Sequence, residues 1–345
     1  MDLQIALLLA QDGIVNGAIY ALLALALVLV FTVTRVIFIP QGEFVAYGAL
    51  TMAALQAGKL PGTLWLLLGA GVLVTLVEGA TALRRGNTRL LWRVAAINLL
   101  LPLVVAGLVA WSDPANLSMP LQVVLALAVV VPLGPMIYRL AFQPLAEASV
   151  LVLLIVAVAV HLSMVGLGLL FFGAEGSRTT AFSEASFELG SLVINGQTLW
   201  VLGASSALIA ALYLFFERTL YGKALRATAL NRVGARLMGI STVMAGKLSF
   251  TLAALIGATS GILIAPLATI YYDTGFLIGL KGFVGAIIGG LASYPLAAAG
   301  AVLVGLLEAY SSFWASAYKE VIVFTLIIPV LVWRSLKAHH SEEEE

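Results

Sequence analysis

The sequence contains no cysteine and few charged residues, and each shortage excludes a class of protein. Because the 345 residues include no cysteine, the chain has no disulfide framework and no thiolate chemistry. Charged residues make up only 10% of the chain, whereas a soluble domain contains about 25%. Hydrophobic residues make up 62%. We therefore expect an all-α polytopic membrane protein rather than a soluble domain.

Sequence motifs for catalysis, metal binding and nucleotide binding are also missing. The chain has no H-E-x-x-H, no G-x-S-x-G and no G-x-x-x-x-G-K-[ST] motif. We expect no catalytic residues, no metal site and no cofactor in this chain, so any ATP hydrolysis would be supplied by another subunit. His161 lies alone in an apolar run, where it is either a hydrogen-bonded packing residue or a proton relay.

Apolar runs long enough to cross a bilayer recur along the chain. A transmembrane helix needs about 20 apolar residues, or fewer where the helix is short or broken. By this criterion we expect about eleven transmembrane helices, some of them broken or short. The predicted spans are residues 12–34, 43–57, 63–78, 94–111, 120–138, 149–172, 199–216, 248–270, 275–292, 296–312 and 320–333.

The basic residues indicate which loops face the cytoplasm, because cytoplasmic loops are enriched in lysine and arginine. With the N-terminus outside and the C-terminus inside, fourteen of the eighteen basic residues fall in inner loops. They are Arg35, Arg84, Arg85, Arg89, Arg93, Arg139, Arg218, Lys223, Arg226, Arg232, Arg236, Lys247, Arg334 and Lys337. The first apolar segment has no basic region of a cleavable signal peptide before it, so we expect it to be retained.

Two regions outside the predicted spans stand out. Residues 173–198 form the longest outer loop, in which Asn195-Gly196 predicts a hairpin turn. This loop is either a lid or receptor-contact surface, or a solvated connector. Residues 334–345 are expected to be a disordered cytoplasmic tail.

Residues 217–247 are the longest polar and basic island of the chain. Arg232 and Arg236 lie four residues apart on the predicted helix, where like charges repel by about 0.2–0.5 kcal/mol. We therefore expect an anion from outside the helix close to them. The loop either lies on anionic lipid headgroups or docks an acidic soluble partner. An apolar stripe on another face of the helix contains Leu225, Ala229, Val233 and Leu237.

Two apolar helices are interrupted, one in each half of the chain. Pro40 and Gly42 interrupt the first, and Gly289-Gly290 followed by Pro295 ends the second. Interrupted helices in both halves of a membrane protein indicate a translocation site. The freed backbone groups cannot face lipid, so they are buried in protein or line a wet cavity. Glu43 either lines this pathway or pairs with Arg35.

Other polar residues lie within apolar runs. Lys281 would cost about 2.5–3.5 kcal/mol at the bilayer centre, so it either reaches the outer face or lines a pathway. Glu308 and the Lys319-Glu320 pair are most simply local ion pairs. Asn16 and Tyr20 form interhelical hydrogen bonds or line a pore. Glycine pairs four residues apart predict close helix packing at Gly13/Gly17, Gly257/Gly261, Gly275/Gly279 and Gly285/Gly289.

Several segments together resemble the LivH-type permeases of branched-chain amino acid ABC importers. The similarity lies in ATALNRVGARLMGIS (227–241), KLSFTLAALIGATSGIL (247–263), TGFLIGLKGFVGAIIGGLASYP (274–295), NGAIYALLALALVLVF (16–31) and QGEFVAYGAL (41–50). The order of these motifs and their polar positions are specific to the family. Departures include Gln41 in place of the family's histidine and Leu230-Asn231 in place of an acidic pair. The resemblance implies a permease domain covering 1–333, in which residues 62–119 have no clear counterpart and are expected to form an added helical hairpin on the lipid side.

The resemblance implies a non-enzymatic, multi-pass subunit of a bacterial inner membrane importer. Its implied partners are a second permease of similar fold, two cytoplasmic ATPase subunits that bind ATP and Mg, a periplasmic solute-binding protein and membrane lipid, with no nucleic acid. The solute is a branched-chain or other hydrophobic amino acid, an amide, urea or an aromatic acid. Expected pathway residues are Asn16, Tyr20, Gln41, Glu43, Tyr47, Lys281 and Ser293. Expected ATPase-coupling residues are Arg226, Asn231, Arg232, Arg236 and Gly239.

Two other functions fit the residues alone. A stand-alone channel or secondary transporter for a small polar solute would need neither ATP nor partners. A polytopic membrane enzyme would use Glu43 or His161 in a chemical step. Transport by the isolated chain would favour the first of these alternatives, and loss of a chemical turnover on substitution would favour the second.

Overall fold

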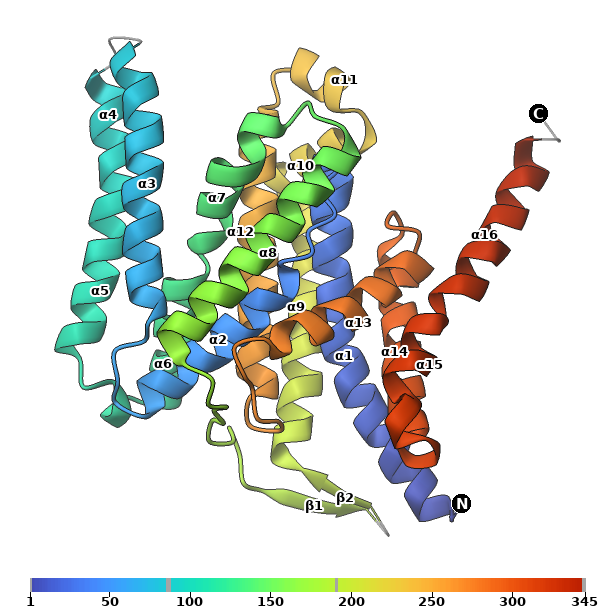
Figure 1. Cartoon of the computed structure of the whole chain (residues 1–345). Helices are drawn as coiled ribbons and strands as arrows, with labels where there is room; N and C mark the ends of the chain where they lie inside the picture. The colour runs from blue at the N-terminus through green and yellow to red at the C-terminus, as the bar shows by residue number, and fades with distance from the viewer. Residues whose placement is uncertain (1, 85–87, 190–191, 343–345) are drawn as a thin grey trace.

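The computed structural model describes residues 2–84, 88–189 and 192–342, which form a bundle of helices with one small hairpin. The N-terminus and the β1–β2 hairpin lie at one end of the bundle, and α11 lies at the other (Figure 1). The helices are α1 (Leu3–Thr34), α2 (Gln41–Gln56), α3 (Thr63–Arg84), α4 (Thr88–Ala95), α5 (Leu101–Trp111), α6 (Met119–Val130), α7 (Leu133–Ile137), α8 (Val150–Phe172), α9 (Gly196–Arg218), α10 (Leu220–Leu230), α11 (Arg232–Leu237), α12 (Thr242–Ile264), α13 (Thr274–Ile288), α14 (Tyr294–Trp314), α15 (Lys319–Thr325) and α16 (Ile327–Glu342). Short π or 3₁₀ turns cover Ala96–Leu100, Pro114–Asn116, Tyr138–Phe142, Gln143–Leu145 and Ser316–Tyr318.

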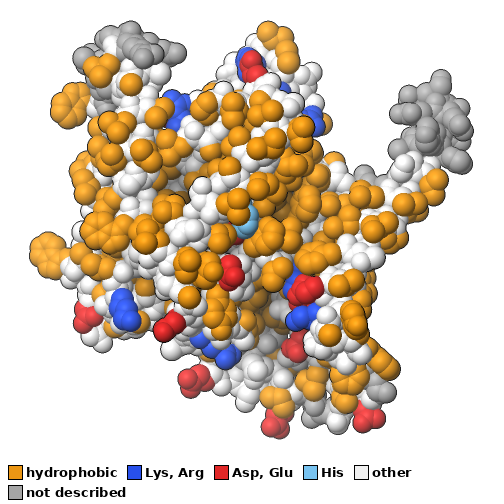
Figure 2. All heavy atoms as spheres, viewed as in Figure 1, with side chains coloured by type: hydrophobic (Ala, Val, Ile, Leu, Met, Phe, Trp, Pro, Cys, Tyr) orange, Lys and Arg blue, Asp and Glu red, His pale blue; other side chains and the backbone are white. Residues whose placement is uncertain are grey.

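Nine helical segments in the described part of the chain are long and apolar enough to cross a membrane. The two remaining predicted spans, 43–57 and 275–292, correspond to the shorter helices α2 and α13. Hydrophobic side chains cover most of the face shown in Figure 2, and most charged side chains lie towards its two ends. The prediction of an all-α polytopic membrane protein is therefore confirmed, whereas the number of spans and their orientation remain predictions.

Helix α1 is the centre of the fold because three other helices pack along it. It contacts α14, α12 and α13, and side chains such as Ile19, Leu22 and Val28 are fully buried. The inner loops predicted from the basic residues lie at one end of the bundle, and the N-terminus lies at the other end (Figure 1). This separation agrees with a topology in which N-terminus and C-terminus lie on opposite sides.

Helices α2 and α13 are too short to cross the hydrocarbon layer alone. With 16 and 15 residues, they are about 24 Å long or less, whereas the layer is about 30 Å thick. Helix α1 ends at Arg35, which has a φ of 63°, and α13 is followed by Gly290 with a φ of 66°. Both interruptions predicted from the sequence are therefore present. Helix α2 packs on α12 and α13, and α13 packs on α14, α1 and α2.

Gly42 has a different role from the predicted one, because it lies inside α2 and does not interrupt it. A side chain at this position would overlap the carbonyl oxygen of Gly275 on α13. The interruption itself falls at Arg35–Pro40, where the chain leaves α1 before Pro40 caps α2. Gly42 and Gly275 thus let the two short helices touch backbone to backbone.

The other glycine pairs also lie at close helix contacts, as predicted. Added Cβ atoms at Gly13 and Gly17 would lie 2.8 Å from backbone atoms of α14. At Gly261 an added Cβ would overlap the carbonyl oxygen of Val45 on α2, and at Gly285 it would lie 2.6 Å from Ala301. These contacts explain why small residues recur every four positions in the central helices.

Residues 62–119 form two neighbouring helical arms, α3 and α4–α5, at the edge of the bundle (Figure 1). Glu78 on α3 joins this pair to the bundle at its inner end. Its carboxylate lies 2.5 Å from Arg139 Nε and 3.1 Å from Lys247 Nζ at the start of α12. That the segment is an addition to the family's fold remains a prediction.

The outer loop contains the predicted hairpin, but its turn lies elsewhere. Strand β1 (Ser186–Leu189) pairs antiparallel with β2 (Leu192–Asn195), with Leu189 opposite Leu192. Asn195-Gly196, predicted as the turn, instead ends β2 and begins α9, because the closing pair of the hairpin is Leu189 with Leu192 and Asn195 pairs with Ser186 at its open end. Another part of the loop is held on the bundle, since the Arg178 guanidinium donates to the carbonyls of Pro266 and Leu267.

The C-terminal segment is helical where the structure describes it. Helix α16 continues from Ile327 to Glu342, whereas we predicted a disordered tail from residue 334; residues 343–345 lie outside the described part. No glycine or proline follows Pro329, so the sequence has no residue that ends the helix. Helix α16 packs only on α13 and α15 and extends away from the bundle (Figure 1).

Candidate functional site

The first turn of α2 places a carboxylate inside the bundle. Glu43 is 0% exposed, and its Oε1 lies 3.0 Å from Nδ1 of His161 on α8. Its Oε2 has no hydrogen-bond partner among the described residues. The His161 ring stacks on Phe276 of α13 with 4.4 Å between ring centroids. The predicted alternative partner, Arg35, is exposed and does not pair with Glu43.

Gln41 and Tyr47, also predicted on the pathway, fix α2 to its other neighbours. The Gln41 amide donates from Nε2 to the Ala253 carbonyl of α12 at 2.9 Å, while its Oε1 is buried without a partner. The Tyr47 hydroxyl donates to the Met164 carbonyl of α8 at 2.6 Å. Helix α2 therefore contacts α12 through Gln41 and contacts α8 through Glu43 and Tyr47.

Lys281 belongs to a buried ionic cluster that joins four helices. Its Nζ lies 2.5 Å from Glu308 on α14 and 3.1 Å from Glu320 on α15. The Tyr20 hydroxyl of α1 donates to the other Glu308 oxygen at 2.6 Å. The prediction that Lys281 reaches the outer face is wrong, since it is 6% exposed. The prediction of local pairs is also wrong, because both carboxylates meet Lys281 across helices.

Asn16 and Ser293 lie apart from these groups. Asn16 is one turn before Tyr20 on α1 and is half-buried. Ser293 precedes α14 at the inner end, and its side chain makes no capping hydrogen bond. The structure therefore joins Tyr20 with Lys281 and keeps Gln41, Glu43 and Tyr47 together on one helix. It does not bring Asn16 or Ser293 to either group.

The basic island consists of two helices rather than the single helix predicted. Asn231 breaks the chain between α10 and α11, and its side chain accepts a hydrogen bond from Gly234 N at 2.8 Å. After α11, Gly239 adopts a φ of 81°, which is unfavourable for other residues. Ile240 N then donates to the Ala235 carbonyl, as in a glycine-terminated helix. Asn231 and Gly239 are residue types that favour these two caps, but we did not predict either cap from the sequence.

Within this island the arginines have partners in the chain. Arg236 Nη1 lies 3.5 Å from Glu147, and Arg232 Nη1 donates to the Ala146 carbonyl at 2.9 Å. Arg226 pairs with Glu217 at 2.6 Å. The predicted anion is therefore Glu147 in the segment before α8, and Arg232 meets a carbonyl instead.

The break at Asn231 divides the predicted apolar stripe. Leu225 on α10 is buried, with an exposed fraction of 1%, whereas Val233 and Leu237 on α11 are 70% and 83% exposed. Leu230 and Met238 beside them are equally uncovered. Helix α11 thus presents apolar side chains outward at the inner end, with the arginines holding it to the chain.

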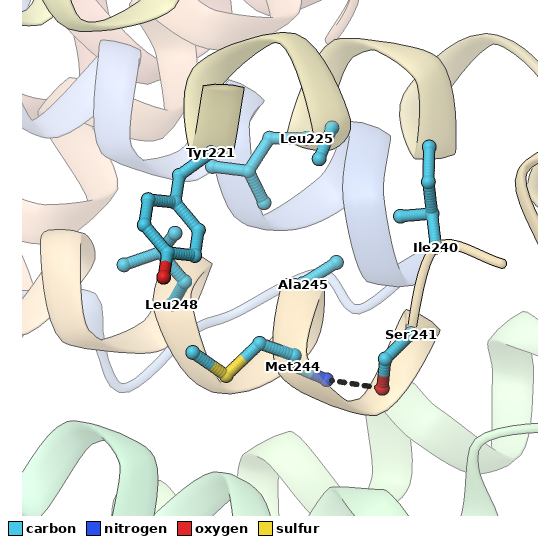
Figure 3. Close-up of a pocket in the computed structure, with 8 residues that line it drawn as sticks. Tyr221, Leu225, Ile240, Ser241, Met244, Ala245 and Leu248 are labelled. Atoms are coloured by element: carbon cyan, nitrogen blue, oxygen red, sulfur yellow. Dashed lines mark hydrogen bonds between the residues drawn. The ribbon is translucent and has the colours of Figure 1, made fainter. Parts of the chain in front are cut away.

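A surface pocket of ≈ 200 Å³ lies between α10 and α12, lined by Tyr221, Leu225, Ile240 and Met244 among others (Figure 3). Ser241 at its edge caps α12 by accepting from Met244 N at 3.3 Å. Tyr221 and Met244 are exposed, so the pocket is open to the surface.

The described residues contain no group of three or more histidine and acidic side chains that could hold a metal. The arrangement can instead position charged groups within the membrane and present an apolar helix at its inner end. Groups of this kind in a membrane protein mark solute or ion pathways.

Comparison with known proteins agrees with the resemblance. Residues 9–331 match the family described as branched-chain amino acid transport system / permease component. The chain is 27% identical to the high-affinity branched-chain amino acid transport system permease protein LivH of Salmonella typhimurium, over 93% of this chain and 91% of that protein. It is 28% identical to BraD of Pseudomonas aeruginosa, named as a permease protein of the same kind of system, over 63% of this chain and 74% of that protein.

One solved structure, PsaBC from Streptococcus pneumoniae in complex with Fab, aligns with 93% of this chain and 90% of that chain. Its TM-score is 0.37 and its identity 9%, a likeness too low to inform the fold. The family match, in contrast, covers nearly the whole sequence. The protein is therefore a member of the family of permease components of branched-chain amino acid transport systems.

Proposed function

We propose that this chain is the membrane-spanning subunit of an ATP-driven importer in the bacterial inner membrane. Its solute would be a branched-chain or other hydrophobic amino acid, or a related amide, urea or aromatic acid. The observation that carries the proposal is the contact between α2 and α13, two short helices enclosed in the bundle. Gly42 and Gly275 bring their backbones together, and Glu43 and Lys281 put charges beside them. Short helices with polar groups at membrane depth are typical of transport sites.

Two observations support a separate ATPase as the source of energy. The sequence has no phosphate-binding loop for ATP. Helix α11 exposes Val233, Leu237 and Met238 while both of its ends are capped by Asn231 and Gly239. A short, rigid helix with an apolar outer face fits a groove on another protein. We assign this face to a cytoplasmic ATPase subunit.

The complete importer would then contain a second permease of similar fold, two ATPase subunits and a periplasmic binding protein. The outer loop 173–198, with its exposed Glu175, Glu184 and Glu188, lies at the end opposite α11. This arrangement gives the binding protein and the ATPase separate ends of the molecule. The position of the basic loops agrees with α11 facing the cytoplasm.

The composition of the purified complex tests this proposal. The chain, tagged at one end, is isolated from its native membrane in mild detergent, and the co-purifying chains are identified by mass spectrometry. We expect a second permease and a protein with a nucleotide-binding site in fixed ratio. A stable homo-oligomer that transports solute without ATP would instead indicate a channel or a secondary transporter, for which the Glu43–His161 pair offers a proton site.

A further inference from the structure

Glu43 has one carboxylate oxygen that nothing in the described part of the chain satisfies. Oε1 meets His161, whereas Oε2 is buried and accepts no hydrogen bond. In the Lys281 cluster, Lys281 pairs with two carboxylates and Tyr20 donates to Glu308, although Glu320 Oε2 is also buried without a partner. Glu43 differs from that cluster in having no lysine or arginine paired with it among the described residues. A buried carboxylate oxygen without a donor is costly, so its persistence indicates a place kept for a ligand.

The groups around Glu43 favour a cationic donor at this place. Tyr47 and Gln41 use their hydrogens on the carbonyls of Met164 and Ala253. Asp273, which precedes α13, adds negative potential at Glu43. His161 hydrogen-bonds Oε1 of Glu43 and makes no hydrogen bond to Oε2. The donors of Gln41, Tyr47 and His161 are therefore used on other atoms, and the added potential is negative, which fits an ammonium group at Oε2 better than a carboxylate.

Two stacked rings cover the carboxylate. His161 on α8 and Phe276 on α13 are nearly parallel, with 28° between their planes. Glu43 is 0% exposed, while His161 is 9% exposed. Separation of His161 on α8 from Phe276 on α13 would part the two rings.

An apolar cavity lies further along the same two helices. Its volume is ≈ 190 Å³, and its walls include Leu154 of α8 and Leu280 and Phe283 of α13. Leu154 precedes His161 by seven residues, or about 10 Å along a helix, towards the inner end. The groove between α8 and α13 thus has a polar position at Glu43 and an apolar position further inward.

We propose that Glu43 Oε2 receives the ammonium group of the solute during transport, after the His161–Phe276 stack opens, and that the apolar cavity then receives its hydrocarbon part. This inference rests on the proposed function and narrows the range of solutes. A hydrophobic solute with a protonated amine fits both positions. Urea and amides lack the charge, and an aromatic acid without an amine carries the opposite charge.

The test uses the full complex in vesicles, with binding protein loaded with radiolabelled leucine and ATP supplied. For Glu43→Gln we expect maximal uptake to fall by about 10-fold to 100-fold, the value of one hydrogen bond to a charged group. Glu43→Asp keeps the charge and should retain measurable uptake. Glutamine still hydrogen-bonds His161, so thermal stability and ATP hydrolysis without binding protein should match those of the unchanged complex.

One further variant separates this role from a general effect of losing a negative charge. Asp113→Asn makes the same acid-to-amide change at an exposed position away from Glu43 and should have no effect on uptake. Uptake by Glu43→Gln equal to that of the unchanged complex overturns the inference. Folded but inactive Glu43→Asp also overturns it, because a charge alone should suffice for partial activity. Failure of the unchanged complex to take up leucine with ATP would overturn the proposed function instead.

Discussion

At the scale of single residues, charged side chains in the membrane part of this protein pair with side chains on other helices. Lys281, Glu308 and Glu320 come from α13, α14 and α15, and Tyr20 adds a hydrogen bond from α1. None of these contacts follows from sequence spacing, since the partners are 27 or more residues apart. The cluster thereby ties the short helix α13 to helices that cross the membrane.

Removal of one member of this cluster should destabilise the protein strongly. Lys281→Met leaves the buried Glu308 carboxylate and the half-buried Glu320 carboxylate without their cation, for which we expect a loss of about 3–5 kcal/mol. Glu308→Gln should cost less, because Glu320 still pairs with Lys281. Thermal unfolding in detergent measures both, and the double variant should be less destabilised than the sum of the singles. Full additivity would show that the two side chains do not interact.

A side chain at position 42 should disrupt the contact between α2 and α13. Gly42→Ala places a methyl group against the Gly275 carbonyl, so the backbones must separate. We expect a destabilisation of about 1–3 kcal/mol and lower uptake. Gly166→Ala on α8 is the matched control, because no atom lies within 4 Å of an added Cβ there. Equal unfolding temperatures for the two variants would contradict close packing at Gly42.

At the scale of secondary structure, α11 depends on its two caps. Asn231→Ala removes the bond to Gly234 N and should destabilise the start of α11 by about 0.5–2 kcal/mol. The expected result is a lower ratio of solute transported to ATP hydrolysed, measured in vesicles. Asn231→Asp retains the capping oxygen and serves as the control. A normal ratio for the alanine variant would show that the cap is dispensable.

The arginines of α11 act through the segment before α8. Changing Arg232 and Arg236 to glutamate removes their contacts with Ala146 and Glu147, so α11 should lose its position without unfolding the membrane helices. We expect ATP hydrolysis to continue while uptake falls.

Exchanging the two charged residues tests the Arg236–Glu147 pair directly. Arg236→Glu combined with Glu147→Arg should recover uptake lost in either single variant. The effect on stability should be small, about 0.2–1 kcal/mol, since both side chains are exposed. No recovery in the double variant would mean that Arg236 contacts a partner protein instead of Glu147.

Long apolar helices and their interruptions were predictable from the sequence, but the contacts of α11 were not. Hydrophobic runs and the residues around Pro40 and Gly289-Gly290 locate helices because they act locally. The stripe through Leu225 and Val233 misled because a four-residue repeat does not reveal a break at Asn231. Asparagine as an N-cap was the signal that should have divided the helix.

At the scale of the whole molecule, the family and the general architecture were predictable, whereas the pairing of distant polar residues was not. The partner of Glu43 is His161, 118 residues further along the chain, and no local pattern connects them. Similarly, Glu78 meets Arg139 and Lys247 only because α3 packs beside the bundle. Such contacts depend on helix arrangement, which a single sequence specifies only through packing.

Three regions with different proposed roles lie along the bundle. The outer end carries the loop 173–198, the interior holds α2 and α13 in contact, and the inner end presents α11 (Figure 1). Helix α12 connects these levels, since it begins after α11 and packs along α2. A movement of α11 would therefore reach the short helices through one continuous element.

The most direct test measures leucine uptake into vesicles that contain the chain with its ATPase subunits and binding protein. The central claim is that α11 passes the energy of a separate ATPase to the pathway. We predict uptake that requires ATP and the binding protein, and its loss in the Val233→Asp/Leu237→Asp variant, whose two changed side chains are exposed and contribute little to the fold. Uptake by the chain alone, or unchanged ATP-driven uptake in this variant, would contradict the claim.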